Sequence, residues 1–268
     1  MSTQAMSIDM HLRSLYLTSI SREYAHLADV AAREHWSYEQ YLCRVLEVET
    51  ADRQVRRIDR LLKAAHLPDG KTLATLEREK LPAPARVQLS RLLEGTFVSK
   101  AENVLVFGLP GRGKTHLVAA VGRELIVRLG ITVLFVSTYA LVQELLRAKT
   151  ELRLEKHLAR LDHFDVIVVD DIGYVQQSRD EMEVLFTFLA DRYERRSLMI
   201  TSNLVFSQWD RIFKDAMTTA AAIDRLVHHS IIIELTGESY RVEHATQQTG
   251  ANVATAKARG GKPTKNAQ

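Results

Sequence analysis

The chain has almost no cysteine and no long apolar run, and each absence excludes a class of protein. Its one cysteine among 268 residues is Cys43, which excludes an intramolecular disulfide framework and a metal site built from several thiolates. No apolar run approaches the roughly 18–20 residues that a membrane-spanning helix needs. The N-terminus lacks the basic segment, apolar core and cleavage site of a secretory signal. We therefore expect a cytoplasmic protein with no membrane partner.

Net charge is also nearly absent. The chain has 36 basic and 33 acidic side chains, which gives a formal charge of +3 at pH 7. Segment 246–268 contains several Lys and Arg residues and no acidic residue, so the rest of the chain is close to neutral. A surface that binds nucleic acid must therefore come from local clusters of basic residues. The hydrophobic fraction of 46% and the charged fraction of 26% exclude wholesale disorder, a collagen-like fibre and a coiled-coil rod.

Three zones of different composition follow one another along the chain. Residues 1–95 carry apolar side chains at helical spacing and predict a small all-helical N-terminal domain. Pro82 and Pro84, near the end of this zone, mark the linker before the second zone. Residues 96–245 form a second domain of mixed character. Residues 246–268 have hardly any large apolar side chain, and we expect them to form a disordered basic tail.

The second domain alternates short runs rich in β-branched residues with amphipathic segments of helical length. The predicted strands are Val104–Phe107, Thr132–Val136, Val166–Val169, Leu198–Thr201 and Ser230–Leu235. The predicted helices include Thr115–Leu129, Leu141–Leu161 and Arg179–Arg195. Because the strands are apolar on both faces, this pattern predicts an α/β fold with a parallel five-stranded sheet between helices.

A glycine-rich loop follows the first predicted strand. The run Gly108-Leu-Pro-Gly-Arg-Gly-Lys-Thr115 fits the phosphate-binding pattern G-x-x-x-x-G-K-[ST], with a strand before it and a helix after it. Glycines let successive backbone N–H groups point at a phosphate chain, and the helix N-terminus adds partial positive charge. We expect Lys114 to reach the β- and γ-phosphates and Thr115 to bind Mg²⁺. The residues expected to bind the nucleotide are Gly108, Pro110, Gly111, Arg112, Gly113, Lys114, Thr115 and His116. The alternative is a strand–helix turn that matches the pattern by accident.

Two acidic residues end the third predicted strand, where open parallel sheets bind their ligands. Asp170 is expected to hold the magnesium, directly or through water, and Asp171 to polarise an attacking water molecule. The alternative for Asp171 is a helix or turn cap.

Two further positions favour hydrolysis over phosphate transfer to a small molecule. Asn203 ends the next strand, where its amide would lie beside the γ-phosphate, although it is also a common turn residue. Arg225 lies in an amphipathic segment before the last strand. It pairs with Asp224 or Glu234, or is solvated, or reaches the γ-phosphate of a neighbouring subunit as an arginine finger.

Two predicted helices carry basic residues along one face and are candidates for contact with DNA. Their residues are Arg53, Arg56, Arg57, Arg60 and Lys63 in the first, and Arg147, Lys149, Arg153 and Lys156 in the second. No aromatic residue lies between them, which favours contact with the phosphates of double-stranded DNA over stacking on bases. We therefore expect binding with weak sequence specificity. The alternative is a solvated face with internal Glu–Arg pairs. His228 and His229 have no further ligand at metal spacing, and we interpret them as structural.

Four segments together resemble one known family. GLPGRGKTHL, VIVVDDIGY, YERRSLMITSNLVFSQW and AAIDRLVHHSIIIELTGESYR are similar to the IstB-type helper ATPases of insertion sequences, a branch of the AAA+ superfamily near the DnaC helicase loaders. The resemblance extends to about His244. It implies an ATP-dependent DNA-binding protein that forms homo-oligomers on DNA and assists an IstA-like transposase in target selection and strand transfer. By position it implies that Asp170 and Asp171 are the acidic pair, Asn203 the first sensor and Arg225 the trans-acting finger.

The sequence departs from the wider superfamily at two points. Many members have Glu where Asp171 stands, and little or no chain is left for a C-terminal helical lid, so Arg241 is only a weak candidate for a second sensor arginine. Three other functions remain open. One is a DnaC-like replicative helicase loader, another is a DNA-binding scaffold in which ATP is only an assembly switch, and the third is a small-molecule kinase.

Overall fold

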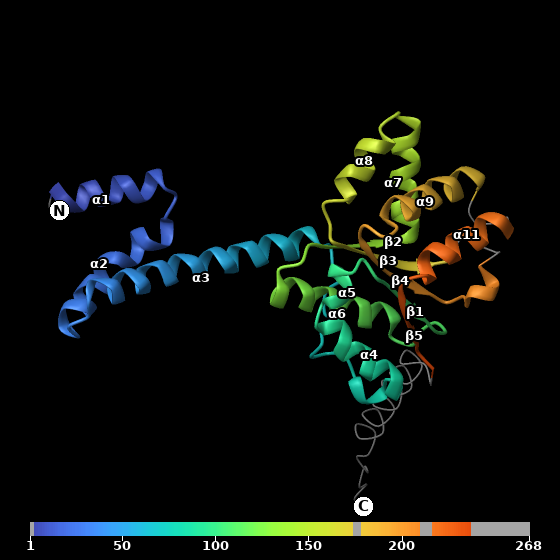
Figure 1. Ribbon diagram of the computed structural model, residues 1–268, viewed down its shortest axis with the longest axis horizontal. Helices are drawn as coiled ribbons and strands as arrows, with labels where there is room; N and C mark the ends of the chain where they lie inside the picture. Colours follow the sequence, from blue (N-terminus) through green and yellow to red (C-terminus); the bar gives the residue numbers. More distant parts are fainter. Residues whose placement is uncertain (1–2, 174–177, 210–215, 237–268) are drawn as a thin grey trace, which may run out of the picture. The chain divides into compact units, whose positions relative to one another are not determined.

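The computed structural model describes residues 3–173, 178–209 and 216–236 of the chain (Figure 1). The predicted basic tail, residues 246–268, and Arg241 lie outside the described residues. No described helix combines the length and the apolar character that crossing a membrane requires.

Helices and strands alternate through most of the described chain. The α-helices are α1 (Thr3–Ser14), α2 (Thr18–Arg33), α3 (Tyr38–Ala64), α4 (Ala83–Leu93), α5 (Thr96–Ser99), α6 (Lys114–Leu129), α7 (Thr138–Thr150), α8 (Leu154–Leu161), α9 (Arg179–Arg192) and α11 (Ala216–Val227). Short 3₁₀ turns are η1 (Arg78–Lys80) and η2 (Phe206–Gln208). The strands are β1 (Asn103–Phe107), β2 (Val133–Ser137), β3 (Val166–Ile172), β4 (Ser197–Ser202) and β5 (Ser230–Glu234).

The contacts divide the chain into two compact units, Met1–Lys63 and Ala64–Gln268. The sequence placed the end of the N-terminal domain near residue 95. In the structure α4, which precedes that point, packs against α6 and β5 of the second unit. Its buried residues Ala85, Leu89 and Leu92 supply that contact, which is why the division falls before it.

A buried carboxylate connects α2 and α3 in the first unit. Glu49 on α3 is only 4% exposed, and its Oε2 accepts hydrogen bonds from the backbone N–H groups of Ser19 (2.9 Å) and Ile20 (3.3 Å) at the start of α2. The first N–H groups of a helix have no partner within it, and a negative charge there also interacts favourably with the helix dipole. The other oxygen of Glu49 accepts from Arg53 Nε at 2.8 Å. Glu49 therefore caps α2 from a different helix.

We expect Glu49→Gln to destabilise this capping contact by about 1–3 kcal/mol, because a buried charge-assisted network loses its charge. Burial raises the pKa of the Glu49 carboxyl, but the hydrogen bonds from Arg53, Ser19 and Ile20 outweigh it and hold the pKa below its ordinary value of 4.5. The stabilisation is therefore fully present above pH 4.5 and is lost as the pH falls through the lower pKa of the folded state. Hydrogen exchange of α2 amides across this pH range measures both effects.

The matched control is Glu47→Gln on the same helix, whose exposed carboxylate pairs with Arg44. It should leave the exchange of α2 amides unchanged. Equal protection of α2 in the Glu47 and Glu49 variants at neutral pH would show that the cap contributes nothing.

The second unit is built on one parallel sheet in the order β2-β3-β4-β1-β5, as the strand–helix alternation predicts. Leu105, Ile167 and Ile200 belong to a core shared with α7, α8, α9 and α11 on one face, and α6 covers the other face (Figure 1). Both faces are therefore buried, which explains the continuous apolar runs of the strands. This order places the loop after β1 beside the carboxyl end of β4, with β3 next to it.

The prediction of one helix over Leu141–Leu161 is wrong. The chain forms α7 and α8, which are separated where Leu152 adopts a left-handed φ of 56°. Arg153 N–H donates to the carbonyl of Ala148 at 2.7 Å and so closes the end of α7. Both helices bury leucines in the same core, so the apolar spacing continues across the break and conceals it in the sequence.

Candidate functional site

The glycine-rich loop joins the end of β1 to the start of α6. Gly108 has φ 153°, and a Cβ at this position would lie 2.6 Å from the backbone oxygen of Leu235, so only glycine fits. Gly113, at the N-cap of α6, has a left-handed φ of 83°. This turn leaves the first backbone N–H groups of α6 at the loop, where an anion can accept them.

Lys114 lies inside the loop with its ammonium group held by oxygen atoms. The residue is only 7% exposed. Its Nζ donates to the carbonyls of Gly108 (2.7 Å) and Leu109 (3.1 Å) and to Oδ1 of Asn203 (2.5 Å). The sequence predicted that Lys114 and Asn203 act at one site, and the structure brings them into direct contact.

The two aspartates end β3 at an irregularity in the strand. The register between β3 and β4 shifts between Val169 and Ile172, and Asp171 has a left-handed φ of 63°. In a regular strand, neighbouring side chains point to opposite faces. The irregularity lets both carboxylates join one hydrogen-bonded network, a common use of bulges beside functional sites. Aspartate adopts left-handed φ more readily than most residues, which gives a physical reason for Asp at this position.

Asp170 contacts both the loop and the neighbouring strand. Its Oδ2 accepts a hydrogen bond from Thr115 Oγ1 at 3.1 Å, and its Oδ1 accepts one from Thr201 Oγ1 at 2.7 Å. Thr115 and Asp170 are the residues that the sequence assigned to a metal ion, and they lie side by side. Both offer oxygen atoms, the ligands that Mg²⁺ prefers, so the pair fits a bound Mg²⁺.

Asp171 faces Asn203 and is fixed from the backbone as well. Asn203 Nδ2 donates to Asp171 Oδ1 at 2.7 Å, and the Asp171 N–H donates to Thr201 Oγ1 at 2.8 Å. Thr201 therefore connects the two aspartates, a role that sequence analysis missed. Its position at the end of a buried strand beside Asn203 was the available signal.

A cavity of about 400 Å³ opens at this network, within the range of small-molecule sites. It is lined by loop residues 110–116 together with Asp171, Thr201 and Asn203. Its remaining lining residues, which sequence analysis did not assign to the site, are Lys71, Thr75, Leu76 and Glu77.

His116 joins that extra wall to the loop. Its Nε2 lies 3.1 Å from the carbonyl oxygen of Thr72 and 3.1 Å from Thr75 Oγ1. In turn, Thr75 Oγ1 donates to the carbonyl of Gly70 at 2.6 Å. His116 thus contacts the segment that completes the cavity, and it also lines the cavity itself.

The residues present fit a bound phosphate chain. Arg112, which lines the cavity, has buried Nε and Nη1 atoms with no hydrogen-bond partner among the described residues. Buried donors without a partner are costly, and a phosphate would supply acceptors for them. With Lys114 and the start of α6, the loop offers a positive, donor-rich surface to an anion.

Arg225 does not line this cavity in its own chain. Its guanidinium lies over the ring of Phe186 on α9, with Cζ 4.5 Å from the ring centre, a cation–π contact. In the part of the chain that the structure describes, Nη1 is buried without a hydrogen-bond partner and the side chain forms no ion pair. The pairing with Asp224 or Glu234 that the sequence left open is not what the structure has.

Several basic residues proposed for DNA contact are engaged by acids. Arg53 and Arg56 pair with Glu49 and Asp52. In the second unit, Lys149 pairs with Glu183 at 2.8 Å. The pairs on α3 match the alternative of ion pairs within one helix, whereas Lys149 on α7 pairs with a residue of α9.

Other members of the two sets remain exposed. Arg60 and Lys63 on α3 are exposed, and so are Arg147 on α7 and Lys156 on α8. Within the described ranges, Arg147 and Lys156 form no ion pair.

The matching family and the similar proteins agree on one kind of protein, an ATP-binding protein of insertion sequences. The sequence profile of the family described as "IstB-like ATP binding protein" matches residues 10–248. A putative insertion sequence ATP-binding protein of Sinorhizobium fredii is 44% identical over 88% of this chain and 79% of its own length. The insertion sequence IS21 putative ATP-binding protein of Pseudomonas aeruginosa is 36% identical over 88% of this chain and 89% of its own length.

Solved structures with a similar fold include DnaI and the replication initiator DnaA. The crystal structure of DnaI matches with a TM-score of 0.52 at 24% identity, over 65% of this chain and 94% of that chain. A structure of the replication initiator DnaA bound to AMPPCP and single-stranded DNA matches with a TM-score of 0.55 at 18% identity, over 69% of this chain and 56% of that chain. At these identities the likeness concerns the fold alone, the α/β core that the sequence predicted.

Proposed function

Because this chain belongs to the family of IstB-like ATP-binding proteins, we propose that it is an ATP-hydrolysing, DNA-binding AAA+ protein that assists the transposase of an insertion sequence. ATP binding is the property that the family itself carries. Hydrolysis, assembly on DNA and help in target selection and strand transfer are the further steps of the proposal. The observation that carries it is the network joining Lys114 to Asn203 and Asn203 to Asp171.

The loop and the two acids divide the chemistry between them. Lys114, Arg112 and the N-terminus of α6 bind and orient the phosphates. Thr115 and Asp170 would hold Mg²⁺, which adds positive charge at the β- and γ-phosphate oxygens. Asp171 would accept a proton from a water molecule, and Asn203, bonded to both Lys114 and Asp171, would orient that water. A bound phosphate would attract Lys114 away from Asn203 Oδ1. Because Asn203 also bonds Asp171, the presence of phosphate would then affect the position of Asp171.

The position of Arg225 supports a site that is complete only when two subunits assemble. In its own chain it contacts Phe186 and not the cavity. A neighbouring subunit must therefore provide the cavity if Arg225 is to reach a γ-phosphate. We propose a homo-oligomer in which each site combines Asp171 of one subunit with Arg225 of the next.

Exposed basic residues on α3, α7 and α8 support contact with the phosphates of double-stranded DNA. Such contacts are sequence-independent and weaken steeply with salt. Relatives named as insertion sequence ATP-binding proteins support a transposase as the protein partner.

Two inactive variants tested as a mixture give the sharpest experiment. Asp171→Asn and Arg225→Ala should each lower DNA-stimulated phosphate release by roughly 100-fold or more, since a general base and an arginine finger contribute at least that much. Their mixture should recover measurable activity, because some interfaces then combine an intact Asp171 with an intact Arg225. A mixture of Asp171→Asn with Lys114→Ala is the control, and it should stay inactive because both residues line the same cavity.

The outcome separates the proposal from its competitors. Full activity of Arg225→Ala, or no recovery in the mixture although both variants assemble, would refute the shared site. Intact ATP-dependent assembly of the unmodified protein without phosphate release would identify a scaffold in which ATP is only a switch. Capture of a replicative helicase but not of a transposase by the full chain would identify a helicase loader.

A further inference from the structure

A cluster of three potential metal ligands lies at the amino edge of the sheet. Glu194, His228 and His229 each offer one ligand atom, and these atoms lie within 4.8 Å of one another. Glu194 Oε1 is 3.8 Å from His229 Nε2 and 4.0 Å from His228 Nδ1. Spacing along the chain indicates no third ligand for the histidines, because Glu194 lies more than thirty residues before them. The fold brings that turn to them.

The backbone that carries these ligands is held in place. Glu194 follows the end of α9 with a left-handed φ of 56°, and the next two N–H groups both donate to the carbonyl of Arg192, at 3.1 and 3.0 Å. The carbonyl of His229 accepts a hydrogen bond from the backbone N–H of Asn103 at 2.7 Å. An ion therefore has to order only side chains, which lowers the entropic cost of binding.

The side-chain geometry is close to that of a metal site. Zinc–ligand bonds of about 2.0–2.2 Å in tetrahedral geometry put neighbouring ligand atoms roughly 3.3–3.6 Å apart. The 3.8 and 4.0 Å between Glu194 and the two histidines need a contraction of a few tenths of an ångström. The two histidine nitrogens lie within 4.8 Å of each other and need to approach by up to about 1.5 Å, which exposed side chains make by rotation. The two imidazole rings already converge, with centroids 4.2 Å apart. The Tyr193 hydroxyl lies 3.2 Å from His228 Nδ1, and an ion bound at this nitrogen would replace that contact.

We propose that Glu194, His228 and His229 form a binding site for a divalent transition metal ion of the class that prefers imidazole, with Zn²⁺ as its representative. Two imidazoles and one carboxylate suit Zn²⁺, Ni²⁺ or Cu²⁺, whereas Mg²⁺ and Ca²⁺ prefer oxygen ligands alone. All three residues are exposed, so an ion can enter and water can complete its coordination.

This site is separate from the nucleotide site. Its ligands precede β4 and β5, whereas the phosphate-binding loop and Asp170 lie at the carboxyl ends of the strands. A bound ion would tie the turn between α9 and β4 to the turn between α11 and β5. Because Arg225 lies near the end of α11, the ion would also hold the helix that carries it. The site itself does not depend on the proposed function.

Zinc binding by the full-length, tag-free protein tests the proposal directly. After removal of metals by a chelator, equilibrium dialysis against Zn²⁺ with Mg²⁺ in excess should show a site that Mg²⁺ does not fill. Glu194→Gln and His229→Asn should each weaken Zn²⁺ binding by roughly tenfold or more, since even the outer partners of a metal ligand contribute that much. His163→Asn is the matched control, because His163 is exposed on the same unit but belongs to no such cluster among the residues that the structure describes.

Two readouts complete the test. Added Zn²⁺ should raise the melting temperature of the unmodified protein but not that of Glu194→Gln, as expected for a ligand that binds only the folded state. Retained ATP binding in each variant shows that it is folded. The proposal is overturned if the unmodified protein binds no Zn²⁺, or if Glu194→Gln and His229→Asn both bind Zn²⁺ as tightly as His163→Asn.

Discussion

Lys114→Ala protein is expected to bind ATP about 10- to 100-fold more weakly than the unmodified chain. A hydrogen bond to a charged group contributes about 1.5–3 kcal/mol, which corresponds to that range. The ammonium group is almost fully buried at the cavity, where water screens its attraction to phosphate less than at the surface. Alanine cannot replace that charge.

The position of Lys114 strengthens this expectation. Gly108, Leu109 and Asn203 hold its Nζ beside the cavity before the nucleotide arrives. The ammonium group has only to exchange these oxygens for phosphate oxygens, so little entropy is lost on binding. Removing it also leaves the Asn203 side-chain oxygen without that donor. We therefore expect the variant to lose both affinity and the orientation of Asn203.

Equilibrium dialysis with labelled ATP measures the effect. Lys100→Ala is the control, because Lys100 is exposed and lies outside the residues that line the cavity; it should bind ATP as the unmodified chain does. If Lys114→Ala protein with an unchanged melting temperature retained ATP equally well, the assignment of this cavity to ATP would be wrong.

The sequence predicted the sheet well because each strand is a short run of apolar residues buried on both faces. Val166 to Val169 is an example, since all four side chains are fully buried. The glycine-rich loop was equally accessible, because its pattern is local and its glycines are required by backbone geometry. Features that depend only on neighbours in the chain could therefore be predicted.

Contacts between distant segments could be predicted only where both segments follow the carboxyl ends of parallel strands, as Thr115 and Asp170 do; the others could not. The left-handed φ of Asp171 arises where β3 meets β4, and nothing in the local pattern indicates it. Thr75 and its neighbours complete the cavity although they lie far before the loop in the chain. Arg192 is a third example, because nothing in the predicted helix Arg179–Arg195 distinguishes it from the other charged residues there.

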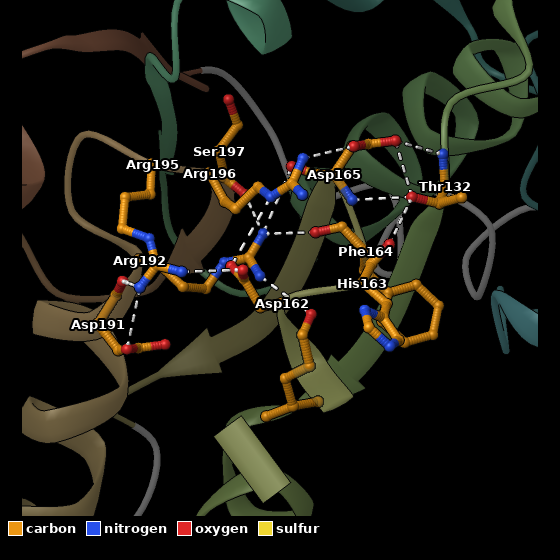
Figure 2. Close-up of polar contacts among 11 residues, drawn as sticks. Thr132, Asp162, His163, Phe164, Asp165, Asp191, Arg192, Arg195, Arg196 and Ser197 are labelled. Atoms are coloured by element: carbon orange, nitrogen blue, oxygen red, sulfur yellow. Dashed lines mark hydrogen bonds and ion pairs between the residues drawn. The ribbon is translucent and has the colours of Figure 1, made fainter. Parts of the chain in front are cut away.

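In the structure Arg192 is buried, and its guanidinium donates hydrogen bonds to backbone carbonyls at the ends of several elements (Figure 2). The residue is 1% exposed. Its Nη1 donates to the carbonyl of Leu161 at 3.1 Å, and its Nη2 donates to those of Phe164 (2.9 Å), Asp165 (3.4 Å) and Ser197 (3.3 Å). Burial lowers its pKa to about 10, so the guanidinium stays charged at neutral pH. One side chain thus links the end of α8 to the starts of β3 and β4.

Arg192→Met is expected to lower the free energy of unfolding of the second unit by about 3–5 kcal/mol. Methionine fills much of the volume but leaves the buried carbonyls without their donors. The melting temperature should fall by roughly 10 °C. Arg192→Lys should fall in between, because one ammonium group cannot reach all the carbonyls that the guanidinium fork spans.

Trp209 provides the measurement. The chain has two tryptophans, and Trp209 is fully buried against Phe107 in the second unit. In a Trp36→Phe background, its fluorescence during urea unfolding therefore reports on that unit alone. Arg195→Met is the control, since Arg195 also pairs with acids but its side chain is 56% exposed, and it should change stability by less than about 1 kcal/mol. Equal midpoints for the Arg192 and Arg195 variants would show that the buried guanidinium does not stabilise this edge of the sheet.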